Sequence, residues 1–126
     1  MGLITLLTDF GLSDGYVAAM KGVILSLTPQ ACIVDVSHAI EPGAISSAAY
    51  LIYSVYRTFP EDTVHVIVVD PGVGTERRAL AHRAGGYWFV APDNGVLSLV
   101  CDPQAGETYL LENSSLWRQP VSATFH

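Results

Sequence analysis

Apolar residues in the first half of the chain occur either in short continuous runs or at helical spacing. Three runs of β-branched and large apolar residues predict buried strands, at Leu3–Thr8, Cys32–Val36 and Thr63–Val69. Between these runs, apolar residues recur every three or four positions over 16–27 and 45–56, which predicts two helices. We expect Ser13 or Asp14 to cap the first helix, and Pro29 and Pro60 to follow the helix ends.

The second half of the chain predicts a hairpin, followed by short elements. Residues 79–82 and 87–90 flank Gly85-Gly86 and suit two antiparallel strands. A short helix over 96–100 and a late strand over 108–111 complete the expectation. Because strands alternate with helices before the hairpin, the crossovers should be right-handed and the sheet mostly parallel. We therefore predict an α/β fold: a Rossmann-like, three-layer α/β/α domain whose mostly parallel sheet carries a hairpin.

Three of the predicted strands end in an acid with a glycine close behind. Asp9, Asp70 and Asp93 each occupy such a place. The carboxyl ends of parallel strands meet at one edge of a sheet, where open α/β sheets bind ligands. One cleft lined by acids and glycines is the preferred interpretation. The alternative is three unrelated turns whose aspartates cap backbone N–H groups.

Composition narrows the class of partner. The 126 residues, taken as one domain (1–126), carry six basic and twelve acidic side chains, a formal net charge of −6. No Lys/Arg cluster is present to bind phosphates, so we expect no nucleic-acid partner. Two cysteines without CxxC spacing favour a reducing, cytoplasmic location. No stretch approaches the roughly 20 apolar residues that span a bilayer, so we expect no membrane partner.

Several familiar catalytic motifs are absent from the sequence. There is no P-loop, no Gly-x-Gly-x-x-Gly after the first strand and no Gly-x-Ser-x-Gly. His38, His65 and His82 lack metal-ligand spacing, so no metal site is assigned to them. Carboxylates in a cleft can hold ribose hydroxyls or coordinate Mg²⁺, and the residues alone leave both possibilities open.

Five motifs together resemble one family, the S-adenosylmethionine hydroxide adenosyltransferases, which are hydrolase relatives of fluorinase and chlorinase. They lie at Thr8–Tyr16, Asp35–His38, Val69–Arg78, Pro92–Gly95 and Thr124–His126. The resemblance covers essentially the whole chain. It implies hydrolysis of S-adenosylmethionine to adenosine and methionine by water attack at C5′ of the ribose, with no cofactor.

The resemblance also assigns roles to residues. Asp70, Arg77 and His126 match an Asp-Arg-His set that positions and polarises a water near C5′. The residues that match substrate-binding positions are Asp9 at the ribose hydroxyls, Asp14 toward the sugar and methionine, Val73 and Phe125 around the nucleophile, and Asn94.

Two of these positions differ from the halogenating relatives. A tyrosine replaces Asp70 in the halogenases, and a threonine replaces Val73 in fluorinase. A fixed carboxylate repels an anion, so Asp70 favours water over halide as the nucleophile.

Members of this family continue past the Phe-His motif into a β-rich second domain. In those relatives the ligand lies between two subunits of a trimer. We therefore expect the 126 residues to be the N-terminal domain alone, contributing half of a site in a homotrimer. Two other hypotheses remain: a non-catalytic module that binds adenosine or S-adenosylmethionine or serves in assembly, and a Mg²⁺-dependent phosphohydrolase using Asp9 and Asp70.

Overall fold

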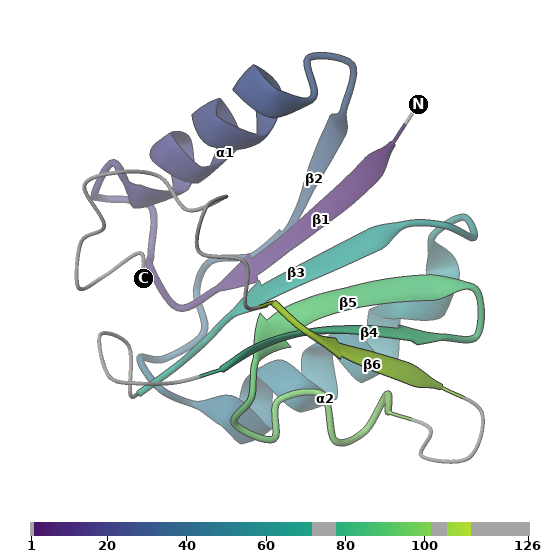
Figure 1. Ribbon diagram of the computed structural model, residues 1–126. Helices are drawn as coiled ribbons and strands as arrows, with labels where there is room; N and C mark the ends of the chain where they lie inside the picture. The colour runs from purple at the N-terminus through teal and green to yellow at the C-terminus, as the bar shows by residue number, and fades with distance from the viewer. Residues whose placement is uncertain (1, 72–77, 102–105, 112–126) are drawn as a thin grey trace.

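The structure, a computed structural model, describes residues 2–71, 78–101 and 106–111. These residues form one six-stranded sheet, two α-helices and a 3₁₀ helix (Figure 1). In chain order the elements are β1 (Leu3–Thr8), α1 (Tyr16–Leu27), β2 (Cys32–Ser37), α2 (Ile45–Val55), η1 (Tyr56–Thr58), β3 (Val64–Val68), β4 (Ala79–Ala84), β5 (Tyr87–Pro92) and β6 (Glu107–Leu110).

The sheet is mixed, with the strand order β2-β1-β3-β5-β4-β6. β1 pairs in parallel with both β2 and β3, and β5 pairs in parallel with β3. β4 is antiparallel to β5 and to β6, which confirms the predicted hairpin. From β1 the chain crosses to one neighbour through α1, then returns past β1 to the other neighbour through α2. The α/β class is therefore as predicted, and the strands β2, β1, β3 and β5 are parallel to one another.

Two local predictions were wrong. α1 begins after Gly15 with no side-chain cap, so neither Ser13 nor Asp14 caps it. Residues 96–100 form hydrogen-bonded turns instead of a helix, with the N–H groups of Val100 and Cys101 both donating to the carbonyl of Leu97. The preceding strand turns sharply at Gly95, whose φ is +88°, and five residues are too few to propagate a helix without strong caps.

The principal core lies between α2 and one face of the sheet. Ala48 and Ile52 of α2 pack with Ile67, Val69 and Phe89 from the middle of the sheet. The small Ala48 lets the helix approach closely, and all five side chains are buried. α1 has only one buried residue, Val17. In the described part of the chain, no helix is long and apolar enough to cross a membrane.

A row of side chains crosses the sheet on the same face as this core. Five strands each contribute one side chain to this row, and neighbouring members are paired in the sheet register: Thr5, His65, Phe89, His82 and Thr108. The Nδ1 atom of His65 is 2.6 Å from the Thr5 hydroxyl, and that of His82 is 2.7 Å from the Thr108 hydroxyl. Among the described residues neither Nε2 atom has a hydrogen-bond partner. Each imidazole therefore has one buried ring nitrogen whose hydrogen-bonding capacity the described residues leave unused.

Acid should destabilise the fold through His65. Burial lowers the pKa of His65 to about 4 from 6.5, because the charged imidazolium is poorly solvated among aromatic rings. The unfolded chain binds a proton near pH 6.5 and the folded chain only near pH 4. Stability is therefore complete above pH 6.5 and falls as the pH drops toward 4, by about 3 kcal/mol in all.

The measurement is urea unfolding of the wild type and of the variant Thr5→Val/His65→Phe at pH 7 and pH 4.5. The variant replaces both hydrogen-bonding partners by apolar groups, which limits its own cost. We expect it to lose less stability than the wild type between the two pH values. Equal losses would show that His65 is not the titrating group.

Candidate functional site

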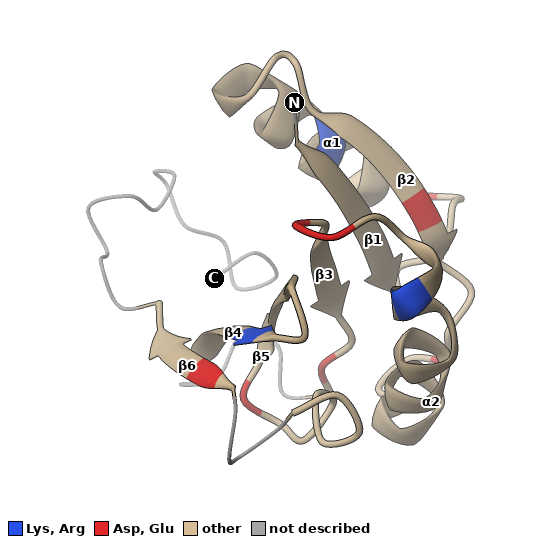
Figure 2. Cartoon of the chain, turned by 90° about the vertical axis from the view of Figure 1, so that its right-hand side faces the viewer, with Lys and Arg blue, Asp and Glu red and all other residues tan. Residues whose placement is uncertain are grey.

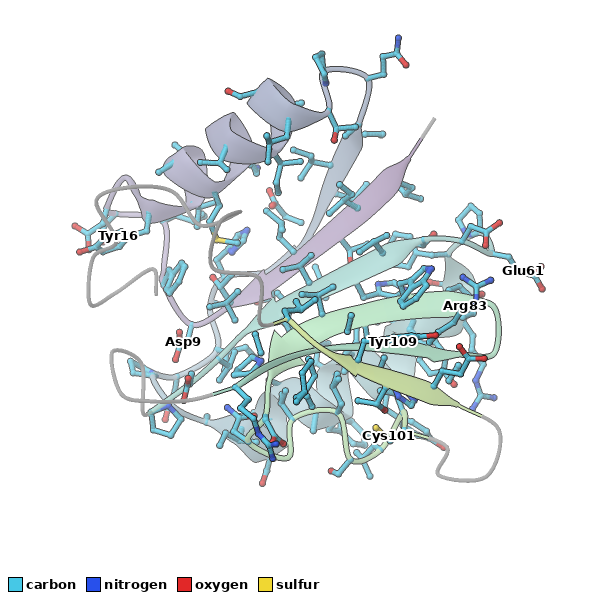
Figure 3. The ribbon with its side chains drawn as sticks, in the orientation of Figure 1. Asp9, Tyr16, Glu61, Arg83, Cys101 and Tyr109 are labelled. Atoms are coloured by element: carbon cyan, nitrogen blue, oxygen red, sulfur yellow. The ribbon has the colours of Figure 1, made fainter. Side chains whose placement is uncertain are left out.

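A cleft of about 530 Å³ opens where β1 and β3 end. It is lined by Asp9, Phe10, Tyr16, Pro42, Gly43, Val68, Asp70 and Pro71. These residues come from the end of β3, the loops after β1 and β3, the first residue of α1 and the segment before α2. Figure 3 shows Asp9 and Tyr16 at one end of the sheet, with Glu61 and Arg83 at the other. The carboxyl ends of the parallel strands therefore form the cleft, as predicted.

Asp9 joins two walls of this cleft. One carboxylate oxygen, Oδ2, accepts a hydrogen bond from the N–H of Gly43 at 2.8 Å. The backbone N–H of Asp9 donates to the carbonyl of Val68 at 3.4 Å, which holds the residue against the end of β3. A carboxylate has about four acceptor sites, so Asp9 can hold Gly43 and still accept hydrogen bonds from a ligand.

Gly43 packs where a larger residue would not fit. Its φ is +74°, a left-handed conformation that favours glycine. A Cβ at this position would lie 3.0 Å from the Cβ of Pro71, closer than an ordinary van der Waals contact. The segment before α2 therefore sits directly on the residue that follows Asp70.

Two aromatic rings form an apolar wall beside the acids. The rings of Phe10 and Tyr16 are 5.8 Å apart between centroids, at an interplanar angle of 54°. A cation close to aromatic faces is stabilised by their quadrupoles, and nearby carboxylates add to that attraction. The cleft therefore combines two acids with a wall suited to a flat or positively charged ligand.

The third predicted acid lies elsewhere. Asp93 is not among the described residues that line the cleft, and its Oδ2 is 3.1 Å from a guanidinium nitrogen of Arg78. The next residue, Asn94, donates from its side-chain amide to the carbonyl of Val69 at 2.9 Å and accepts from the N–H of Val96 at 3.1 Å. This turn therefore holds the strand end just before Asp70 in place. Of the three predicted acids, Asp9 and Asp70 are the two found among the described residues that line the cleft.

Of the other predicted site residues, the structure describes Asp14 but not the remaining four. Asp14 is exposed on the loop before α1, outside the cleft lining but two residues from Tyr16. Arg77, Val73, Phe125 and His126 lie outside the described residues. Their roles remain predictions.

The structure adds lining residues that sequence reasoning did not single out: Phe10, Tyr16, Pro42, Gly43 and Pro71. The Pro-Gly pair before α2 was a turn signal, although nothing in the sequence placed it next to Asp9. In the described part of the chain, no group of three His, Cys, Asp or Glu side chains comes together in a way that could hold a metal ion.

Basic residues do not gather near the cleft in the described structure. Figure 2 shows the Lys and Arg positions of α1 and β4 on separate elements, with acidic positions between them.

Comparisons with known proteins agree with these features. The family model described as the SAM hydroxide adenosyltransferase N-terminal domain matches residues 4–126. A protein of Salinispora tropica named "(R)-S-adenosyl-L-methionine hydrolase" is 42% identical over 98% of the chain and 48% of its own length. One of the same name from Methanocaldococcus jannaschii is 40% identical over 100% of the chain and 49% of its own length.

A more distant relative and a solved structure extend the comparison. A fluorinase of an Actinoplanes species is 30% identical over 98% of the chain and 50% of its own length. The crystal structure of an uncharacterized conserved protein from Thermotoga maritima matches with a TM-score of 0.91 at 40% identity, over 98% of this chain and 48% of that one. The chain thus spans about half the length of the relatives it matches. By the family match and these identities, it belongs to the SAM hydroxide adenosyltransferase family.

Proposed function

We propose that the protein hydrolyses S-adenosyl-L-methionine to adenosine and L-methionine, with this chain supplying one side of the active site. The observation that carries the proposal is the cleft lined by Asp9 and Asp70, in a chain 40–42% identical to proteins named (R)-S-adenosyl-L-methionine hydrolase. In the reaction, a water oxygen bonds to C5′ as the C5′–S bond breaks. The electron pair of that bond passes to sulfur, and the water loses a proton.

Asp9 is proposed to bind the ribose diol. Its carboxylate lines the cleft, is held in place by Gly43, and retains acceptor capacity. Ribose hydroxyls are often recognised by an acid at the end of a parallel strand. Asp14 is proposed to bind the substrate toward the sugar and the methionine. Asn94 is proposed to support substrate binding by keeping the strand end before Asp70 in place.

Asp70 is proposed to orient the attacking water, together with Arg77 and His126. A sulfonium leaves as a neutral thioether, so the leaving group needs no general acid. The protein must instead supply an aligned, partly desolvated water, and positioning of this kind can lower a barrier by roughly 7–11 kcal/mol. Val73 and Phe125 are proposed to exclude other water from this pocket.

The remaining proposals concern the whole protein. Because the chain spans about half of its relatives' length, we propose that a second domain of a neighbouring subunit completes the site in a homotrimer. We also propose a cytoplasmic enzyme that needs no cofactor. The connections through α1 and α2 run in opposite directions across the sheet. This supports a Rossmann-like, three-layer arrangement, because connections with the usual right-handed sense would place their helices on opposite faces of the sheet.

Replacing Asp70 should separate turnover from binding. In the full-length protein, Asp70→Asn keeps the shape of the side chain and weakens its hold on water. We expect kcat for adenosine release to fall at least 100-fold and the Kd for adenosine to change less than threefold. Asp93→Asn, in a similar turn outside the cleft, is the matched control and should retain activity. Equal losses of turnover and binding in Asp70→Asn would refute the role given to Asp70.

A larger residue at position 43 should distort the cleft. Gly43→Ala forces a methyl group against Pro71 and strains a left-handed residue, so we expect adenosine to bind at least tenfold more weakly. Gly85→Ala is the control, because Gly85 also has a positive φ, +59°, but open space around it. Calorimetry on both variants checks this. Unchanged affinity in Gly43→Ala would place the ligand elsewhere.

Assays of binding and turnover also distinguish two alternative functions. If the full-length protein binds adenosine tightly but releases none from S-adenosylmethionine, it is a binding module. If EDTA abolishes an activity toward phosphate esters, the two acids serve a Mg²⁺-dependent phosphohydrolase. The proposed reaction continues in EDTA.

A further inference from the structure

Four polar side chains form a continuous chain from α1 to the end of β1. The ammonium of Lys21 donates to Oδ2 of Asp35 at 2.7 Å, and Oδ1 of the same carboxylate lies 2.8 Å from Nε2 of His38. Nδ1 of His38 in turn lies 2.8 Å from the hydroxyl of Thr8. Lys21 and Asp35 are at the surface, whereas His38 is 5% exposed and Thr8 is fully buried. The chain therefore leads from solvent to the residue before Asp9.

The charge of Asp35 fixes the direction of its two hydrogen bonds, and the tautomer of His38 sets the direction of the bond to Thr8. Burial raises the pKa of Asp35, but the hydrogen bonds from Lys21 and His38 outweigh this and hold that pKa below its ordinary value. The ionised carboxylate can only accept, so His38 donates from Nε2. In the neutral imidazole, Nδ1 then has a lone pair and accepts the Thr8 hydroxyl proton. The oxygen of Thr8 is left to accept the N–H of Phe10, which lies at 3.2 Å.

His38 thereby holds the backbone on both sides of Asp9. Its side chain acts through Thr8, whose hydroxyl bridges across Asp9 to the N–H of Phe10. Its carbonyl accepts the N–H of Gly11 at 2.8 Å. Both residues of the loop that line the cleft, Asp9 and Phe10, lie between these two attachments.

A bulge in β2 makes the arrangement possible. Residues three apart on a regular strand point to opposite faces, so Asp35 and His38 would not meet. Here Leu6 pairs with Asp35 and Leu7 pairs with Ser37, so β2 contains one extra residue at this point. The extra residue brings Asp35 and His38 to the face of β1 that carries Thr8. Bulges often occur beside functional sites, where they redirect a side chain.

We propose that His38 is a positioning residue for ligand binding, which Asp35 and Lys21 hold in the tautomer that fixes the Asp9 loop. The inference rests on the proposed binding role of Asp9. Thr5, also on β1, forms a similar pair with His65 of β3, but that pair faces the core and neither residue lines the cleft. It provides an internal comparison, because both threonines are fully buried and both bond to Nδ1 of a buried histidine.

The first experiment compares the two threonines in the full-length protein. Thr8→Val removes the hydroxyl at almost constant volume, Thr5→Val does the same at the core pair, and Thr8→Ser keeps the hydroxyl. We expect Thr8→Val to raise the Kd for adenosine and the KM for S-adenosylmethionine at least tenfold, with kcat within threefold of wild type. Thr5→Val should lose similar thermal stability without a change in affinity, and Thr8→Ser should recover most of the binding. Equal weakening in both valine variants would reduce His38 to a structural role and overturn the proposal.

The second experiment acts at the far end of the chain. Asp35→Asn weakens the hold on His38 from the surface, away from the cleft, and should raise the KM about three- to tenfold. Asp62→Asn is its control, since Asp62, like Asp35, is an exposed acid in an ion pair, in this case with Arg83 at 3.4 Å. An unchanged KM in Asp35→Asn would contradict the proposed coupling.

A third readout needs no substrate. Hydrogen exchange at the Gly11 amide should be faster in Thr8→Val and Asp35→Asn than in Thr5→Val and Asp62→Asn. If the wild type fails to bind adenosine, the proposed function is wrong, and exchange at Gly11 still decides whether His38 orders the loop. No difference at Gly11 would overturn that part independently.

Discussion

The parallel pairing of β1 with β3 is the constraint on which the site depends. In this register Thr8 lies opposite Val68, so both strands end at the same level. Asp9 follows β1 directly, and Asp70 follows β3 by two residues. Two carboxylates distant in sequence therefore reach one cleft through backbone hydrogen bonding, before any side-chain contact is considered. The N–H of Asp9 continues this pairing by donating to the carbonyl of Val68.

The two faces of β1 have different roles. On one face, Thr5 and Leu7 belong to the layer covered by α2, where His65 stacks among aromatic rings. On the other face, Thr8 connects through His38 to Asp35, and through it to the surface. The core face fixes the strand, and the other face fixes the loop that follows it. This division explains how a short loop can hold Asp9 in place while its carboxylate remains available to the cleft.

Much of the fold could be predicted from the sequence because its signals are local. The apolar runs and helical spacing gave the strands and helices, and Gly85-Gly86 marked the hairpin. The cap of α1 and the turns at 96–100 could not be predicted, because backbone geometry at Gly15 and Gly95 decided them. Prediction of the cleft succeeded for Asp9 and Asp70, which end strands that pair directly.

Prediction was less complete where contacts between distant segments decide the outcome. Asp93 follows a strand end just as the other acids do, yet it pairs with Arg78, and Asn94 braces the backbone. The contact of Gly43 with Pro71 and the bulge that redirects His38 depend on tertiary packing and strand register. Neither leaves a signal in a single sequence.

In the proposed reaction, water attacks C5′ of S-adenosylmethionine in a cleft formed by Asp9 and Asp70. The most direct measurement is mass spectrometry of the products formed by the full-length protein in water enriched in oxygen-18. The account predicts one labelled oxygen, in the 5′-hydroxyl of adenosine, and none in methionine. Adenosine without the label, or label in the methionine fragment, would contradict it.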